Sequence, residues 1–335
     1  MKLKEETINK LINKIIPKLN QNKIKGENGN VATIGGSLEY SGAPYYSAIT
    51  ALKAGSDLSH VFCHLDACIP IKCYSPELIV HPGFNNSENE DLIKKSIRWF
   101  KSMDSIIFGP GLGREEDIGK IFVTFSNKIT ELESIPLIYD ADGIFFYSKY
   151  YKELKINNNL ILTPNNSEFV KLCNELGEKF NIENNKEFYN KIDILINNNN
   201  ESIYFIDFEK QPELKDIFIN EINICQLFNN CILVKKGKYD VITNGKIIYI
   251  VHNNGCLKRT GGIGDILGGF INSYCGMWSK KCKIEKNNLK QEDLIQCCVL
   301  ACYFCRKYSN LAYEKKLYSL TAPDIIHCID GNYYY

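Results

Sequence analysis

The sequence predicts an α/β protein with three layers, in which helices cover both faces of a central, mostly parallel sheet. Short apolar runs rich in β-forming residues recur along the chain, and each is followed by a glycine-rich or polar turn and then by a helical pattern. The runs are continuously apolar, as is typical of strands buried on both faces. Strands that alternate with helices form parallel sheets.

Five runs carry this pattern. The predicted strands are Val31–Ile34, Ser105–Phe108, Pro136–Tyr139, Leu160–Leu162 and Cys231–Val234. Each is followed by polar or glycine-rich residues, which include GGS, GPGLGR, DAD, TPNNSE and KKGKYD. Because ligands of doubly wound sheets bind beyond the carboxyl ends of the strands, we expect these turns to surround one site.

The other predicted elements fit between these strands. Pro44 suits the first turn of a helix that runs to Ala54, and Gly55 suits its end. A second helix is expected from Ile263 to about Tyr274, directly after a group of glycines. Residues Asp240–Val251 are expected to form a hairpin with Asn-Gly at its turn.

Composition narrows the classes of partner. The 335 residues include 40 Lys and Arg against 39 Asp and Glu, a formal net charge of +1, which argues against a nucleic-acid or membrane-surface protein. No apolar run approaches the roughly 18 residues of a membrane span, and the N-terminus does not resemble a signal peptide. We therefore expect a soluble, cytoplasmic protein, with a mitochondrial pool left open.

Cysteine and histidine are interpreted as structural. The 14 Cys make up too small a share for a disulfide scaffold, and the spacing of Cys298, Cys302 and Cys305 places them on one apolar helix face. We expect reduced packing residues. The five His show no paired spacing, which predicts no zinc site.

The domain organisation follows from the motifs. Length alone suggests about two domains, but turns along what reads as one sheet favour a single catalytic domain over 29–335, preceded by a helical extension over 1–28. An asparagine-rich insertion is expected around 174–230. The asparagine runs Asn157–Asn159, Asn184–Asn185 and Asn197–Asn200 are expected in surface loops, away from any site.

The stretch RTGGIGD contains the most informative chemistry. Gly261, Gly262 and Gly264 permit a tight turn that exposes N–H groups at a helix N-terminus, where an anion is favoured. Asp265 can accept a proton from a hydroxyl that attacks a phosphoryl group. The alternative is a flexible loop before a helix, with Asp265 complementing the helix dipole.

The other turns leave alternatives open. Asn165 and Glu168 can act through water on Mg²⁺, or they can cap a helix. Lys235 or Lys236 with Gly237 can approach a nucleotide, although a solvated turn is the default. GPGLGR suits a phosphate-approach turn or a plain glycine turn. The two aspartates of DAD can bind a hydroxyl or metal, or cap a helix.

Together these motifs resemble the ATP- or ADP-dependent NAD(P)H-hydrate dehydratases, a branch of the ribokinase-like superfamily. The resemblance extends from about Gly29 to Ile329. Seven segments carry it: GNVATIGGSLEYSGAPYYSAITALKAGSDLSHVFC, YSPELIVHP, GPGLGR, DADGIFF, TPNNSEF, VKKGKYDVI and RTGGIGDILGG. It implies a ribokinase-like fold and ATP-dependent dehydration of the S epimer of hydrated NADH or NADPH, by phosphorylation of the hydroxyl and elimination of phosphate.

The resemblance also implies roles for residues. Asp265 would be the catalytic base, and the N–H groups of Gly262, Ile263 and Gly264 would stabilise the phosphoryl group. The expected nucleotide contacts are Lys236, Gly237, Lys238, Tyr239, Asp240, Gly255, Cys256, Leu257, Lys258, Arg259, Thr260, Gly261, Gly262, Ile263 and Gly264. The expected hydrate contacts are Ala43, Gly111, Gly113, Asn165, Asn166, Ser167, Glu168, Phe169, Val170, Lys171 and Asp265.

Mg²⁺ would bind through water near Asn165 and Glu168, with ATP as co-substrate and a homo-oligomer as an expected assembly. Two positions depart from the family pattern: Asn166 stands where many relatives have His, and Ile263 where eukaryotic-looking relatives have Gln. Two alternatives stay open, the first because it shares the fold and the second because of these departures and the insertion. One is a hydroxyl kinase of the hydroxymethylpyrimidine or hydroxyethylthiazole type, and the other is a catalytically silent nucleotide-binding sensor.

Overall fold

A computed structural model describes residues 6–177, 180, 185–197 and 201–333, and these form one sheet with the strand order β3-β2-β1-β4-β5-β6-β8-β9-β10-β7. The strands are β1 (Asn30–Ile34), β2 (Leu58–His64), β3 (Ile79–Phe84), β4 (Ser105–Phe108), β5 (Leu137–Tyr139), β6 (Leu160–Leu162), β7 (Ile203–Asp207), β8 (Ile232–Lys235), β9 (Asp240–Thr243) and β10 (Ile247–Val251). From β3 to β8 all neighbours are parallel, whereas β9, β10 and β7 are antiparallel. The predicted mostly parallel sheet is confirmed, as are the five strands and the hairpin.

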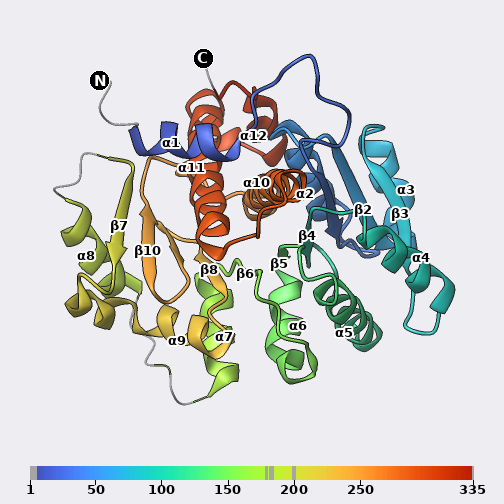
Figure 1. The fold of residues 1–335 in the computed structure, drawn as a ribbon, viewed down its shortest axis with the longest axis horizontal. Helices are drawn as coiled ribbons and strands as arrows, with labels where there is room; N and C mark the ends of the chain where they lie inside the picture. Colours follow the sequence, from blue (N-terminus) through green and yellow to red (C-terminus); the bar gives the residue numbers. More distant parts are fainter. Residues whose placement is uncertain (1–5, 178–179, 181–184, 198–200, 334–335) are drawn as a thin grey trace.

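Helices cover both faces of the sheet, as Figure 1 shows. One face carries α1 (Glu6–Ile15), α2 (Gly42–Lys53), α3 (Leu65–Tyr74), α10 (Ile263–Glu285), α11 (Gln291–Lys316) and α12 (Ala322–Cys328). The other carries α4 (Glu90–Phe100), α5 (Glu116–Thr130), α6 (Asp142–Tyr150), α7 (Asn166–Leu176), α8 (Asn185–Ile196) and α9 (Ile219–Leu227). Short 3₁₀ helices are η1 (Tyr151–Glu153), η2 (Pro212–Phe218) and η3 (Leu317–Ser319).

The continuous apolar strands are explained by burial on both sides. In β4, Ile107 packs into the core beneath α10 and α11, whereas Ile106 and Phe108 pack into the core beneath α5 and α6. All three side chains are 0% exposed. Since successive strand residues point to opposite faces, a strand between two helical layers buries both sets of side chains and is therefore mostly apolar.

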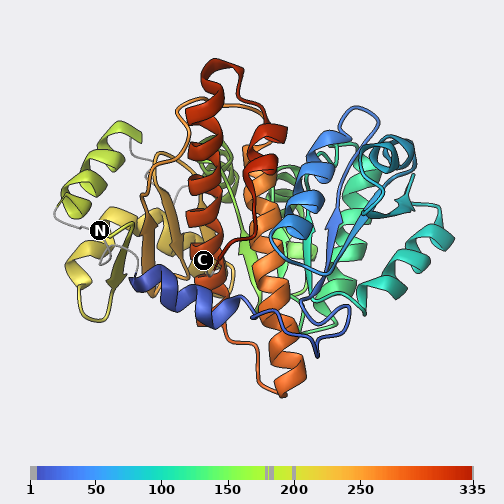
Figure 2. The ribbon, with the colours of Figure 1, turned by 90° about the horizontal axis from the view of Figure 1, so that it is seen from above.

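Helix α10 packs very closely against α2 and β1, because it has glycines at the positions that face them. A Cβ placed at Gly269 would lie 2.4 Å from the Ser47 carbonyl oxygen of α2, and one at Gly276 would lie 2.4 Å from Val31 Cγ1. On its other side α10 runs beside α11 (Figure 2). The helix predicted over Ile263–Tyr274 is therefore longer than expected, because its packing continues to Glu285.

Within the described part of the N-terminal segment, residues 6–28, the helix covers Glu6–Ile15, a shorter stretch than the expected helical extension, and the division into 1–28 and 29–335 stays a prediction. The apolar side of α1, which includes Ile12 and Ile15, is buried in the core cluster that contains α10 and α11. Lys14 Nζ donates a hydrogen bond to Asp293 Oδ1 of α11 at 2.5 Å. The segment thus packs as part of the same body.

The asparagine-rich segment contains more structure than a set of polar loops. Its described residues form α8, β7, η2 and α9, and they enclose a small core that includes Phe188, Ile206 and Phe218. Asn159 also differs from the expected surface position, since it is 8% exposed and donates through Nδ2 to the Glu133 carbonyl at 2.9 Å. Asn184 and 198–200 lie outside the described residues.

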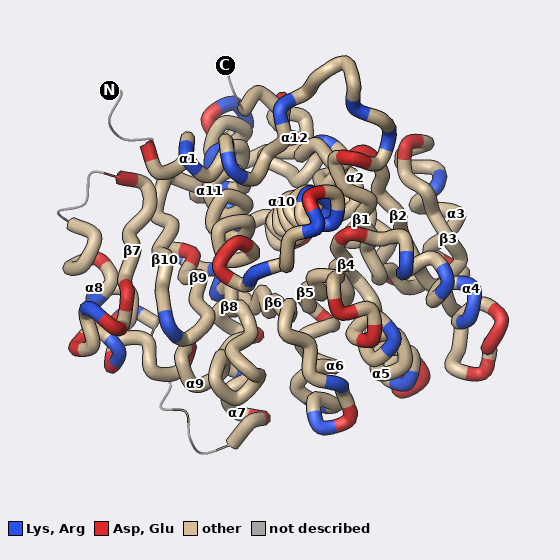
Figure 3. Tube along the Cα trace, viewed as in Figure 1, with Lys and Arg blue, Asp and Glu red and all other residues tan. Residues whose placement is uncertain are grey.

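All 14 cysteines are free, and Cys298, Cys302 and Cys305 are buried in α11, which confirms their packing role. Acidic and basic residues are interspersed along the chain in the view of Figure 3. No helix among the described residues is long and apolar enough to cross a bilayer.

Gly269→Ala tests the close packing of α10. The added methyl group must displace the α2 backbone, so we expect a loss of about 1–3 kcal/mol in the free energy of unfolding. Gly42→Ala in α2 is the matched control, because its Cβ would make only an ordinary 3.7 Å contact with Tyr46. Denaturant unfolding measures both; equal stabilities would contradict the packing argument.

Candidate functional site

The five predicted turns meet at the carboxyl edge of the sheet. Backbone hydrogen bonds connect the first residues of a turn to the neighbouring strand or turn. Four N–H groups donate to the carbonyl of an adjacent strand or turn: Gly109 to Ile34 at 2.9 Å, Asp140 to Phe108 at 3.1 Å, Thr163 to Tyr139 at 3.1 Å, and Lys236 to Pro164 at 2.8 Å. The predicted common site is thus a continuous edge of backbone and side chains.

A buried ion pair lies at the centre of this edge. Lys236 Nζ donates to Asp140 Oδ1 at 2.6 Å, and the Thr163 hydroxyl donates to the same oxygen at 2.7 Å. The side chains of Lys236 and Asp140 are 14% and 2% exposed. A Cβ placed at Gly264 would lie 3.5 Å from Lys236 Nζ, so the pair packs against the first turn of α10. The sequence left Lys235 and Lys236 as alternatives, and only Lys236 faces this edge.

Lys235 instead points to the opposite face of the sheet. Its Nζ pairs with Glu221 Oε1 of α9 at 2.6 Å, and both side chains are under 10% exposed. The same Nζ lies 4.2 Å from the ring centroid of Phe169. Phe169, an expected hydrate contact, is 2% exposed and has its side chain in this core. The structure therefore does not bring the Phe169 side chain to the site.

Asp265 stands in the first turn of α10 beside this pair. Burial, and then the nearby carboxylate of Asp140, raise the pKa of Asp265 to about 7, although Lys236 acts in the opposite direction. No described residue donates a side-chain hydrogen bond to its carboxylate. A carboxyl group that titrates near neutral pH is suited to accept a proton in a reaction.

Gly262, directly before α10, adopts a left-handed conformation with φ of +94°. A Cβ at this position would also lie 2.6 Å from Ala322 Cβ. Both observations require glycine here. In the described part of the chain no side chain caps α10, so the first N–H groups of the helix stay available for an anion.

The α7 N-terminus forms the capping box that one interpretation of TPNNSEF predicts, and the magnesium interpretation stays a prediction. Asn165 Oδ1 accepts the Glu168 N–H at 2.9 Å, and Glu168 Oε2 accepts the Asn165 N–H at 2.9 Å, which confirms the capping alternative. Burial raises the pKa of Glu168, Lys236 opposes this effect, and Asp140 adds to it. Glu168 therefore also belongs to the electrostatic cluster around the ion pair.

The donor set suits a hard cation held through water. The carboxylates of Asp140 and Asp142 both raise the pKa values of Glu168 and Asp265, whereas Lys236, buried beside them, lowers both. Among the described residues, no group of three His, Cys, Asp or Glu lies close enough to hold a metal directly. Oxygen ligands and a retained hydration shell are what Mg²⁺ prefers.

The turn after β4 lies against the turn after β5. A Cβ at Gly109 would lie 1.9 Å from the Asp140 carbonyl oxygen, so this position requires glycine. Asp142 does not cap α6 but accepts the Gly113 N–H at 3.2 Å and Arg114 Nε at 2.8 Å. A Cβ at Gly111 would lie 3.2 Å from Ala43 Cβ. The expected hydrate contacts Ala43, Gly111 and Gly113 therefore lie near one another.

The loop between β10 and α10 carries the expected nucleotide contacts from Gly255 to Gly264. Lys258 Nζ donates to the Tyr318 and Leu320 carbonyls, each at 2.7 Å, so this lysine fastens the loop to the segment before α12. Leu257 is 78% exposed. An exposed leucine beside a glycine-rich turn offers an apolar surface to a planar base.

The sequence did not indicate Arg306 of α11, which fixes the turn between β8 and β9. Its Nε donates to Asp240 Oδ2 at 2.7 Å, and its guanidinium also donates to the carbonyls of Gly237, Lys238 and Asn253. The Asp240 side chain is therefore engaged within the protein. The one available signal was its position: Arg306 directly follows an apolar helical run, and an arginine beside buried residues needs a partner.

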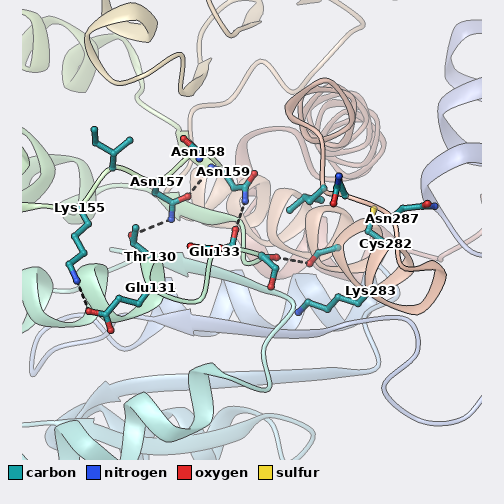
Figure 4. Close-up of a pocket in the computed structure, with 15 residues that line it drawn as sticks. Thr130, Glu131, Glu133, Lys155, Asn157, Asn158, Asn159, Cys282, Lys283 and Asn287 are labelled. Carbon is teal, nitrogen blue, oxygen red and sulfur yellow. Dashed lines mark hydrogen bonds and ion pairs between the residues drawn. The ribbon is translucent and has the colours of Figure 1, made fainter.

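A cavity lies at the amino edge of the sheet, opposite the carboxyl edge that carries the motifs (Figure 4). It measures about 850 Å³ and is lined by residues that include Glu131, Lys155, Asn157 and Lys283. Ser134 and Asn159, which precede β5 and β6, place it at the amino ends of these strands. Volume therefore does not indicate the site, because the carboxyl edge carries the motifs and the perturbed carboxyl groups.

Fold and site together define a ribokinase-like α/β protein. A ribokinase-like superfamily protein of Enterococcus faecalis is similar in structure, with a TM-score of 0.67 and 17% identity over 97% of this chain and 93% of that one. The structure of an ADP/ATP-dependent NAD(P)H-hydrate dehydratase from Bacillus subtilis, co-crystallised with ATP and Mg²⁺, is also similar. Its TM-score is 0.63 and its sequence identity 16%, over 96% of this chain and 94% of that one. At these identities the likeness concerns the fold.

Sequence comparisons identify the family. The family model of NAD(P)H-hydrate dehydratases matches residues 31–205. The ATP-dependent (S)-NAD(P)H-hydrate dehydratase of Entamoeba histolytica is 33% identical over 94% of this chain and 90% of that protein, and the Homo sapiens protein of that name is 30% identical over 94% and 80%. The chain belongs to the NAD(P)H-hydrate dehydratases, a family of lyases, which confirms the resemblance.

Lys236→Met tests the electrostatics of the site. Because Lys236 lowers the pKa values of both Asp265 and Glu168, its removal should raise the pKa of Asp265 above about 7. Carbon-13 NMR of labelled aspartate side chains measures this shift. Lys238→Met is the control, since Lys238 pairs with the distant Asp193. An unchanged Asp265 pKa in a folded Lys236→Met protein would contradict the assigned geometry.

Proposed function

We propose that this protein uses ATP to dehydrate the S epimer of hydrated NADH or NADPH and so restores the functional coenzyme. The observation that carries the proposal is the Asp265 carboxyl group, whose pKa is about 7, at the uncapped N-terminus of α10 beside the Asp140–Lys236 pair. It supplies a proton acceptor next to an anion-binding helix end. Family membership supports the substrate assignment.

The proposed reaction has two steps. In the first step, Asp265 accepts the proton of the hydrate hydroxyl while the hydroxyl oxygen attacks the γ-phosphorus of ATP. The bond from that phosphorus to the bridging oxygen breaks, and ADP leaves. The carbon–oxygen bond then breaks and phosphate leaves with its electron pair, while the neighbouring ring carbon gives its proton to water and the C–H electron pair forms the carbon–carbon double bond of the restored ring. Phosphorylation thus converts a poor leaving group into a good one.

Other residues of the site bind and orient the substrates. The N–H groups of Gly262, Ile263 and Gly264 are proposed to stabilise the transferring phosphoryl group, because they stand at the start of α10. The loop from Gly255 and the turn from Lys236 to Asp240 are assigned to ATP. Mg²⁺, held through water near Asn165 and Glu168, would neutralise charge on the phosphates.

The rival functions are less well supported. A hydroxyl kinase would share this fold but would release a stable phosphate ester, and the relatives found by sequence are dehydratases. A silent sensor would not need a carboxyl group tuned to neutral pH, and Ile263 preserves the backbone N–H that the proposal requires. ATP rather than ADP, and a homo-oligomer, stay predictions of this proposal.

The activity is tested by incubating the protein with S-hydrated NADH, ATP and Mg²⁺. We expect the absorbance of the reduced nicotinamide at its long-wavelength band to recover, together with one ADP and one phosphate per coenzyme. The R epimer is the matched control substrate and should not react directly. Accumulation of a phosphorylated product without recovery of absorbance would favour a kinase, and no ATP consumption would contradict the proposal.

Asp265→Asn tests the catalytic base. We expect turnover to fall by at least about 100-fold, because the amide cannot accept the proton, while ATP binding measured by calorimetry stays close to that of the wild type. In the wild type, kcat/KM should decline below about pH 7 as Asp265 becomes protonated. Normal turnover in Asp265→Asn would exclude this residue as the base.

A further inference from the structure

Helix α8, in the asparagine-rich segment, contacts two of the turns that form the site through the side chain of Tyr189. The Tyr189 hydroxyl oxygen accepts Asn166 Nδ2 at 2.8 Å and lies 3.3 Å from Asn166 Oδ1. The same oxygen accepts the Lys238 backbone N–H at 3.1 Å. One phenol group therefore joins the first residue of α7 to the turn between β8 and β9.

The space for this phenol group is provided by Gly237. A Cβ at Gly237 would lie 1.9 Å from the Tyr189 hydroxyl oxygen, so any other residue here would displace the ring. The φ of Gly237 is not in the left-handed region, which means that the glycine serves close approach and not an unusual backbone conformation. The glycine of this turn is thus required by Tyr189, which lies much earlier in the chain.

A second contact from α8 fixes the same turn. Asp193, one helical turn after Tyr189, accepts Lys238 Nζ at 2.8 Å and the Tyr239 hydroxyl at 2.6 Å. The rings of Tyr189 and Tyr239 meet edge to face, with centroids 6.1 Å apart. From the opposite side, Arg306 holds the Gly237 and Lys238 carbonyls. The turn can therefore move only if its contacts with α8 change.

We propose that Tyr189 is a positioning residue that couples the nucleotide turn at Gly237–Lys238 to the hydrate contact Asn166. This inference rests on the proposed function, which assigns these two segments to the two substrates. When the Gly237–Lys238 turn shifts, the Tyr189 hydroxyl that it contacts moves with it. The Asn166 amide, which is bonded to the same hydroxyl, then moves as well. Binding of either substrate should then raise the affinity for the other by the same factor, as thermodynamic linkage requires.

Tyr189→Phe removes the hydroxyl and keeps the ring. The measured quantity is the ratio of the dissociation constants of a non-hydrolysable ATP analogue without and with saturating S-hydrated NADH. In the wild type we expect a ratio of about five or more, typical of coupled sites, and in Tyr189→Phe a ratio near one. A purely structural role would change the melting temperature but not this ratio.

Tyr204→Phe in β7 is the matched control, since the Tyr204 hydroxyl makes no hydrogen bond to a described residue, and it should retain the wild-type ratio. Asn166→Ala should lose the coupling as Tyr189→Phe does, and the double variant should lose no more, because both changes break one link. A wild-type ratio in Tyr189→Phe, a ratio of one in the wild type, or independent effects in the double variant would overturn the inference.

The two proposals fail in distinguishable ways. If the wild type restores NADH from its S hydrate and Tyr189→Phe keeps the coupling ratio, the function stands and the role of Tyr189 is wrong. If the wild type does not react with the hydrate, both are overturned.

Discussion

The ion pair between Lys236 and Asp140 is the interaction on which the site depends. Burying two charges is costly, and the cost is offset only when geometry and additional hydrogen bonds are good. Here the 2.6 Å contact is completed by the Thr163 hydroxyl. Three turns, after β5, β6 and β8, are thereby fixed relative to one another. Loss of one partner from such a pair commonly destabilises a protein by about 3–5 kcal/mol, because the other charge is left buried.

The same pair sets the protonation of the surrounding groups. Burial and the Asp140 carboxylate raise the pKa of Asp265, and Lys236 limits the increase. Without the lysine, the pKa of Asp265 would rise further, and a smaller fraction of its carboxyl group would be ionised and able to accept a proton at neutral pH. Without the nearby aspartate, its carboxylate would be a weaker base. A stabilising contact of the fold therefore also tunes the proposed catalytic group.

The sequence predicted features that depend on local residue types. Strand ends followed by glycine or acidic residues located the site edge, because parallel strands bring their carboxyl ends together. The choice between Lys235 and Lys236 could not be made from the sequence, because successive residues of a strand point to opposite faces of the sheet. A register shift of one residue would exchange the two lysines. For Phe169 the helical phase of α7 decides the face: its side chain enters the core, so a hydrate contact at this position would involve its backbone.

Long-range partners were not predictable in this way. Tyr189 and Arg306 contact turns that lie 49 and 68 residues away in sequence, and no local pattern encodes such pairs. Asparagine-rich flanks also obscured α8. Yet Phe188, Ile192 and Ile196 recur at intervals of four and are buried, the pattern of an amphipathic helix. Periodicity was a better indicator of structure there than composition.

The capping box of α7 explains how one segment can serve both stability and binding. Asn165 and Glu168 each use one oxygen for the reciprocal backbone contacts. Each side-chain oxygen has a second lone pair, and Glu168 has a second oxygen. The cap therefore leaves acceptors for water around a cation while it fixes their position. ATP is a polyanion, and Lys236, the cation buried beside these carboxylates, is already paired with Asp140. Phosphates would then be held mainly by backbone N–H groups and a hydrated metal ion, which is compatible with a chain whose net charge is only +1.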